Sequence, residues 1–203
     1  MDIKQLPCAT AEAVDAVVDI HMQTFTGFFL TFLGRGFLKT MYRAYCRYEK
    51  AGLLVAQDDG GKIIGFLAYA EDLSGLYKYM IRKELLAFAW YGAGAFLRKP
   101  GIFLRLVRAF LKPGESARKE AYVELASIGV LPTQKGMGIG SKLIDALKER
   151  VDLTRFAYIT LETDALENDA ANSFYKKNGF RLARTYETHE GRKMNEYRWG
   201  ERV

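Results

Sequence analysis

The chain has 203 residues, of which 49% are hydrophobic and 27% are charged, and its formal net charge is +6. This length suits one domain with a sizeable core, and the composition excludes disordered and collagen-like proteins. Two cysteines and two histidines are too few for a disulfide framework or a His/Cys metal site. We therefore predict a single domain over residues 1–203, with free thiols and no metal.

The first third of the sequence alternates helical and strand patterns. The predicted elements are a strand at 3–7, a helix from 11, an aromatic linker at 25–33, a helix at 36–50 and strands at 53–57 and 63–71. Thr10 is a suitable N-cap for the first helix. The two later strands flank the turn 58–61, whose sequence DDGG is a strong hairpin signal.

Residues 73–120 interrupt this rhythm with an aromatic and basic stretch. They carry a net charge of +7, against −1 for the rest of the chain. A uniformly basic surface for nucleic acid is therefore disfavoured, and no nucleic-acid partner is predicted. We expect two or three helical pieces, separated by Pro-Gly pairs at 100–101 and 113–114. The many apolar side chains of 85–112, which alternate with basic ones, are expected to be buried against a partner. Three partners are possible: the domain itself, if the segment is a lid; a second copy, in a homodimer; or a membrane surface.

The last third again mixes strands and helices. The predicted elements are a strand at 121–130, a helix at 138–151, a strand at 158–163, a helix at 169–178 and a hairpin of strands at 180–188 and 193–199. Without strict βαβ alternation, this order predicts an α/β or α+β class with a mixed sheet. No apolar run reaches the roughly 18–20 residues of a spanning helix, and no apolar signal segment opens the chain. We therefore expect a cytoplasmic protein.

A glycine-rich turn joins the strand at 121–130 to the helix at 138–151. Its three alternate glycines are Gly136, Gly138 and Gly140. Glycine lets backbone N–H groups face a ligand, and the amides of a helix's first turn favour an anion. Ser141-Lys142 has the wrong order for a P-loop, and Ser141 stands where a Rossmann fingerprint needs glycine. The turn predicts a phosphate site, the alternative being a glycine-rich connection that binds nothing.

This turn resembles the acetyl-CoA pyrophosphate loop of the GNAT acyltransferase superfamily, in which Arg/Gln-x-x-Gly-x-Gly/Ala follows Val-x-Pro. Val130 and Pro132 match, and Lys135 takes the Arg/Gln position with its charge but without the planar fork. A second segment, NDAANSFYKKNGF at 168–180, resembles the family's Asn-x-x-Ala-x-x-Phe-Tyr-x-x-x-Gly-Phe. Because both motifs occur at the family's spacing, the chain is identified as a member over 122–180.

The resemblance implies a fold and a co-substrate. The fold is a mixed, mostly antiparallel sheet that is splayed between its fourth and fifth strands, at 122–130 and 158–163. Helices flank the sheet, and the helical insertion at 73–120 lies between the third and fourth strands. The co-substrate is acetyl-CoA, and the chemistry needs no metal. The pantetheine arm would lie between the splayed strands, where the amides of Ile128 and Val130 would hold it and polarise the thioester carbonyl. Ordinary ladder pairing of these amides is the alternative.

The resemblance also assigns residues. The pyrophosphate would be held by Lys135, Gly136, Met137, Gly138, Ile139, Gly140 and Ser141. Tyr175 would protonate the departing thiolate, or else only pack as an aromatic side chain. Asn168 would hold the pantetheine arm or cap the helix that follows it.

The general base that removes a proton from the amine is expected on one of the splayed strands. Strand alternation places Glu124 on the face of Tyr122 and Ala126, where its carboxylate could take the proton from the amine. Glu162 and Asp164 are weaker candidates. The alternatives are that Glu124 is a solvated strand charge and that water is the base.

We therefore expect an N-acetyltransferase that moves an acetyl group from acetyl-CoA to a primary amine by direct transfer in a ternary complex. The basic insertion favours a small anionic acceptor, such as an amino sugar or a sugar nucleotide. A protein N-terminus or lysine as acceptor stays open. The alternative from another class is a non-catalytic acyl-CoA-binding or membrane-surface module on the same fold.

Overall fold

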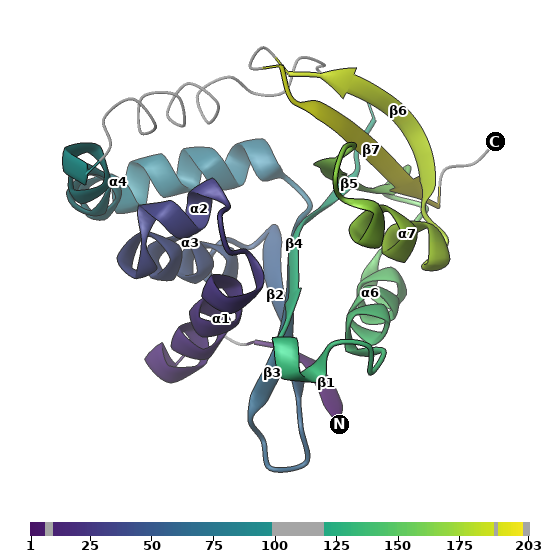
Figure 1. Cartoon of the computed structure of the whole chain (residues 1–203), viewed down its shortest axis with the longest axis horizontal. Helices are drawn as coiled ribbons and strands as arrows, with labels where there is room; N and C mark the ends of the chain where they lie inside the picture. The colour runs from purple at the N-terminus through teal and green to yellow at the C-terminus, as the bar shows by residue number, and fades with distance from the viewer. Residues whose placement is uncertain (7–9, 99–119, 189–190, 201–203) are drawn as a thin grey trace.

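The computed structural model describes residues 1–6, 10–98, 120–188 and 191–200. Seven strands form one sheet in the order β1-β2-β3-β4-β5-β7-β6 (Figure 1). Their bounds are β1 Asp2–Gln5, β2 Ala51–Gln57, β3 Ile63–Ala70, β4 Val123–Val130, β5 Ile159–Asp164, β6 Arg181–Glu187 and β7 Lys193–Trp199. Only the β4–β5 pair is parallel, and the other neighbours are antiparallel. The predicted mixed, mostly antiparallel sheet is confirmed.

Helices cover both faces of the sheet. Their bounds are α1 Ala11–Thr24, α2 Phe29–Leu33, α3 Arg35–Arg47, α4 Leu73–Arg98, α6 Ile139–Arg150 and α7 Asp169–Lys177, with a short 3-10 turn η1 at Pro132–Gln134. Helices α1 to α4 lie on one side of the central strands, and α6 and α7 lie on the other (Figure 1). Helix α1 begins where predicted, because the Thr10 hydroxyl accepts a hydrogen bond from the Ala13 amide at 3.4 Å.

The core has two parts, one on each face of the sheet. Leu53, Val55 and Phe66 pack with α1 and α3, whereas Leu54 and Leu67 pack with α6. Every residue of β3 is buried. This burial on both faces explains why β2 and β3 are nearly continuous apolar runs rather than alternating ones.

The helical pieces predicted at 73–120 begin with one long helix. Helix α4 runs without a break from Leu73 to Arg98, the last described residue before 99–119. The pieces predicted beyond Pro100 lie outside the described residues.

Two strand bounds differ from the prediction. Strand β1 ends at Gln5, two residues earlier than predicted, and β2 starts at Ala51, two residues earlier than predicted. Within the described ranges, no helix is long and apolar enough to cross a membrane.

Strands β4 and β5 separate soon after they begin. They pair only at Val123–Ile159 and Glu124–Thr160. On its other edge, β4 pairs with β3 through a register shift that leaves Ala126 as an extra residue, a β-bulge. Bulges bend a strand and increase its local twist. The predicted splay is therefore present, and the bulge lies directly after the last β4–β5 pair.

Candidate active site

The bulge at Ala126 determines which amides of β4 face the gap beside β5. Before the bulge, the Val123 amide donates to the Tyr158 carbonyl at 3.1 Å, beside β5. After it, the Leu131 amide donates to the Ile64 carbonyl at 2.9 Å, beside β3. Because backbone groups alternate along a strand, the amides of Val130 and Ile128 point away from β3, into the gap. An uninterrupted strand would have turned the opposite set of amides toward β5.

The bulge also changes which side chains share a face, and it corrects the uninterrupted alternation predicted for β4. Glu124 lies on the side of helices α1 to α4, because its charge raises the pKa of Tyr77 on α4. Ser127, three residues later, lies on the same side, where its hydroxyl hydrogen-bonds Tyr42 of α3. Ile128 packs instead against the core that contains α6. An odd spacing of three places two residues on one face only when a bulge intervenes.

The glycine-rich turn leads into the N-terminus of α6. Gly136 and Gly138 have φ values of 86° and 75°, in the left-handed region that favours glycine. The first helical hydrogen bond runs from the Lys142 amide to the Gly138 carbonyl at 3.1 Å, and no side chain caps the helix at Gly138. The amides of Ile139, Gly140 and Ser141 precede that bond, so they have no acceptor within the helix. The geometry suits an anion at the positive end of the helix dipole.

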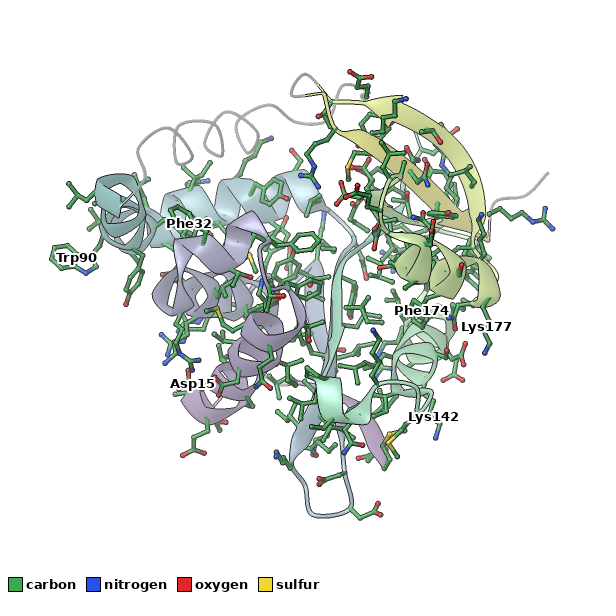
Figure 2. All side chains as sticks on the ribbon, in the orientation of Figure 1. Asp15, Phe32, Trp90, Lys142, Phe174 and Lys177 are labelled. Atoms are coloured by element: carbon green, nitrogen blue, oxygen red, sulfur yellow. The ribbon has the colours of Figure 1, made fainter. Side chains whose placement is uncertain are left out.

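The other side chains of the turn separate into an anchor and an exposed pair. Ile139 is buried against β3, and it holds the start of α6 on the sheet. Lys135 and Met137 are exposed, so a bound ligand can reach both. Gly140 has a packing role as well, because a Cβ there would lie 2.9 Å from the ring of Phe174. Phe174 lies where α7 faces α6 (Figure 2), and the two sequence motifs therefore pack directly on each other.

Tyr175 is surrounded by aromatic rings. Its ring centroid lies 5.4 Å from Phe174, 6.2 Å from Phe180 and 6.1 Å from Tyr197. Within the described part of the chain, its hydroxyl makes no hydrogen bond. Burial raises the pKa of Tyr175 to about 12. The phenol therefore stays protonated at neutral pH. Because an ordinary thiol has a pKa of about 8.5, the phenol is better suited to donate a hydrogen bond to a thiolate than to give up its proton fully.

Asn168 does not cap α7 with its side chain. Its Nδ2 donates to the Thr163 hydroxyl at 2.7 Å, so the amide is turned toward the end of β5. Asn168 is the N-cap residue of α7, as predicted, but the capping hydrogen bond expected of its side chain is absent. The other role, as a partner of the pantetheine arm, stays a prediction.

Asn172 is a buried polar residue that the sequence analysis did not single out. Its Nδ2 donates to the carbonyls of Asp164 and Asn168 at 2.9 and 2.8 Å. Its Oδ1 accepts from the Asn195 amide and the Tyr197 hydroxyl, both at 2.9 Å. These bonds join α7 to β5 and β7 and so orient the helix that carries Tyr175. A polar residue on the inward face of a short amphipathic helix was the available signal.

Two carboxylates lie on the α1–α4 side near the first turns of α4. Burial first, and then the charges of Glu124 and Glu162, together raise the pKa of Tyr77 to about 12. Glu162 also accepts a hydrogen bond from the Tyr186 hydroxyl at 2.7 Å. Asp164 differs, because Arg192 binds both of its carboxylate oxygens, at 2.7 and 2.9 Å. Asp164 is thus an ion-pair partner, which weakens it as a candidate base.

The two catalytic candidates approach the gap from opposite faces of the sheet. Tyr175 packs with the core on the α6–α7 side, whereas Glu124 acts on Tyr45 and Tyr77 of the α1–α4 side. A group held between β4 and β5, beyond their last pair, would lie between these two faces of the sheet. This arrangement suits a reaction in which the acceptor and the leaving group occupy different sides.

A buried polar chain supports the bulge from the α1 side. His21 Nδ1 lies 2.7 Å from the Tyr42 hydroxyl, and Tyr42 in turn hydrogen-bonds Ser127, next to the bulge. His21 is 3% exposed, and within the described ranges its Nε2 has no hydrogen-bond partner. Burial lowers the pKa of His21 to about 4. The imidazole is therefore neutral in the folded protein at pH 7.

This low pKa predicts a loss of stability in acid. Below a pKa of about 6.5 the unfolded chain binds a proton at His21 that the fold does not bind until about pH 4. The free energy of unfolding should therefore fall as pH drops through this window, with about 2 kcal/mol of the loss from His21 between pH 7 and pH 5. Urea denaturation at the two pH values measures it. In the control His21→Gln the loss should be smaller by that amount, and an equal loss would contradict the assignment.

The family is shown by sequence. Residues 14–180 match the Acetyltransferase (GNAT) family, so the chain belongs to this family and is an acyltransferase. No curated relative matches the chain. Within the described ranges, no group of three or more His, Cys, Asp or Glu side chains could hold a metal ion.

Solved structures share the fold. The ribosomal-protein-S18-alanine N-acetyltransferase from Escherichia coli has a TM-score of 0.59 at 16% identity, over 100% of this chain and 95% of that one. The ribosomal-protein-alanine N-acetyltransferase from Brucella melitensis has a TM-score of 0.60 at 15% identity, over 98% and 99%. Aminoglycoside 6'-acetyltransferase type Ii has a TM-score of 0.60 at 13% identity, over 98% and 96%. At these identities the likeness extends to the fold alone.

Proposed function

We propose that the protein transfers an acetyl group from acetyl-CoA to a primary amine, directly and in a ternary complex. The observation that carries this proposal is the gap between β4 and β5, into which the amides of Ile128 and Val130 point. The uncapped N-terminus of α6 lies at the end of the same strand, beyond the turn. An amide-rich pantetheine arm would pair with β4 while its pyrophosphate binds the amides of Ile139 to Ser141.

The charges beside the gap favour an acceptor that arrives as a cation. Glu124 and Glu162 both act on Tyr77 from the α1–α4 side, and a protonated amine would be attracted to these carboxylates. The anionic acceptor expected from the sequence depended on the basic charge of residues 73–120, of which 99–119 lie outside the described residues. We therefore propose an acceptor whose reactive end is an ammonium group, with the first turns of α4 as part of the wall of its site.

The reaction needs four steps from these residues. Glu124, directly or through a water, takes a proton from the ammonium group. The amine nitrogen then attacks the thioester carbonyl carbon, and the Ile128 amide stabilises the oxyanion that forms. The carbon–sulfur bond then breaks, and the nitrogen gives up its second proton to solvent as the neutral amide product forms. Tyr175 donates a hydrogen bond to the departing sulfur, and coenzyme A leaves as the thiol once a proton from solvent has been taken up.

Glu124→Gln tests the base. The variant keeps the shape of the side chain but cannot accept the proton, so kcat should fall by about 10²-fold while the Kd for acetyl-CoA is unchanged. Coenzyme A release with a panel of amines, from pH 6 to pH 9, measures it. The rate of the variant should recover partly at high pH, where the amine loses its proton without help. Glu162→Gln is the matched control, because it removes the neighbouring carboxylate. If Glu124→Gln retains the wild-type kcat, water is the base.

A further inference from the structure

The outer face of α4 changes from basic to apolar along the helix. Lys78 and Arg82 are exposed in its first half. The next outward positions are Leu86, Trp90 and Leu97, whose exposed fractions are 85%, 77% and 82%. These five residues, the α4 outer stripe, recur at intervals of four, four, four and seven, so they share one face of the helix. Figure 2 shows Trp90 projecting away from the body of the protein.

The inner face of α4 is apolar as well. Leu76 and Met80 are buried in the core with α1 and α3. Further along, the ring of Phe88 lies 4.7 Å from that of Phe37 on α3. A surface helix normally has polar residues opposite its buried face. Since the last turns of α4 are apolar on both faces, the exposed side chains of the stripe indicate a partner.

A hollow of about 470 Å³ adjoins the apolar end of the stripe. It is bounded by residues 33–36, at the junction of α2 and α3, and by Trp90, Tyr91, Ala93 and Leu97 of α4. Arg35 is the charged residue among them, and it is paired with Asp19 of α1. The apolar surface thus continues inward from the stripe, and hydrocarbon could enter it.

The charges around the stripe decide between partners. Lys83 adds a third exposed cation, and the single acidic residue of α4, Glu84, is paired with Arg47 at 3.1 Å. The sequence that follows the helix, residues 99–119, has a further net charge of +5. A two-fold dimer through α4 would bring two copies of this basic segment into one interface, and like charges repel each other. An anionic surface attracts all of them.

We propose that the α4 outer stripe docks the enzyme on the surface of an anionic lipid bilayer. Leu86, Trp90 and Leu97 enter the boundary between headgroups and acyl chains, where tryptophan is favoured. Lys78 and Arg82 lie against the headgroups. Tyr77, part of the proposed wall of the acceptor site, is next to Lys78 in the sequence. A docked enzyme would therefore hold its acceptor site close to the membrane.

The test uses the full chain and vesicles of phosphatidylcholine, with and without phosphatidylglycerol. We expect flotation with the anionic vesicles only, and weaker binding as salt rises. The chain has two tryptophans, Trp90 and Trp199. The emission of the wild type should shift to the blue on binding, and Trp90→Phe should lose that shift.

Variants separate the stripe from the rest of the surface. Arg82→Gln with Lys83→Gln should lower the partition coefficient by about 30-fold, and Leu86→Ser with Leu97→Ser should abolish the binding. The matched control is Lys4→Gln with Lys62→Gln, which should bind almost as the wild type does. Both lysines are exposed, one in β1 and the other just before β3, and these two strands lie away from α4 (Figure 1). The Kd for acetyl-CoA should be the same in all of them, which keeps this test independent of the proposed reaction.

Three results would overturn the proposal. The first is equal binding to neutral and anionic vesicles, and the second is wild-type binding by both double variants, Arg82→Gln with Lys83→Gln and Leu86→Ser with Leu97→Ser. The third is a dimer in sedimentation equilibrium that Leu86→Ser dissociates, together with no vesicle binding, because the stripe would then be an interface between two copies.

Discussion

Replacing Tyr175 with phenylalanine should remove the hydrogen bond to the departing sulfur and lower kcat by about 10²–10³-fold, while the Kd for acetyl-CoA changes by less than about threefold. The ring would remain packed among Phe174, Phe180 and Tyr197, so only the hydroxyl is lost. That hydroxyl has no hydrogen bond within the described ranges, and its loss should cost little stability. Single-turnover release of coenzyme A, combined with calorimetry for acetyl-CoA, separates the rate from the binding.

The pH profile adds a second readout for Tyr175. Because burial raises the pKa of this phenol to about 12, its deprotonation should cause no fall in kcat up to about pH 10.

Tyr197→Phe is the matched control for Tyr175→Phe. Its hydroxyl donates to Asn172 at 2.9 Å, so this variant should lose about 1 kcal/mol of stability and keep most of its kcat. A folded Tyr175→Phe enzyme that retains more than about a third of the wild-type kcat would reduce Tyr175 to a packing aromatic.

Gly138→Asp should raise the Kd for acetyl-CoA by at least about 100-fold, because a carboxylate would stand where the proposed pyrophosphate binds. A Cβ at this position would meet no atom within 4 Å, so the effect comes from charge and not from a clash within the protein. The φ of 75° adds strain, which aspartate tolerates better than most residues. Calorimetry with acetyl-CoA measures the loss, and a thermal melt reports whether the variant folds.

Two further variants isolate the charge at Gly138. Gly138→Asn has nearly the same shape and backbone preference without the charge, so it should bind acetyl-CoA much more tightly than Gly138→Asp. Gly61→Asp places the same residue at a φ of 80°, also with no atom within 4 Å, in the turn between β2 and β3. It should show the same strain and no loss of affinity. Equal affinity of Gly138→Asp and the wild type would show that the pyrophosphate does not bind this turn.

Local sequence predicted most of the elements and the backbone conformation of the glycine-rich turn. The turn at 58–61, the cap at Thr10 and the glycines at 136 and 138 act over a few residues, and each was found in the conformation that its chemistry requires. The role of Gly140 was only half predicted, because the ring of Phe174 that excludes a Cβ there comes from a helix about 30 residues away.

The splay was predicted through the family resemblance, but the bulge that accompanies it was not. Ala126 is not a glycine or a proline, and nothing in the sequence around it breaks the strand pattern. A bulge is a property of two paired strands, since the extra residue exists only relative to β3. The amides of Ile128 and Val130 were named from the resemblance, whereas the reason that they face the gap needed the register.

The sequence by itself determined the family, the helix and strand types, and the residues at the start of α6 and on α7 that we propose as the coenzyme site. Only the tertiary structure decided the partners of polar groups: His21 with Tyr42, Asn172 with Asn195, and Asp164 with Arg192. It also placed Glu124 and Tyr175 on opposite faces of the sheet and left Trp90 exposed. The physical reason is the distance along the chain over which each interaction acts. Caps, turns and helix dipoles act within a few residues, whereas burial, ion pairing and strand register depend on segments that are distant in the chain.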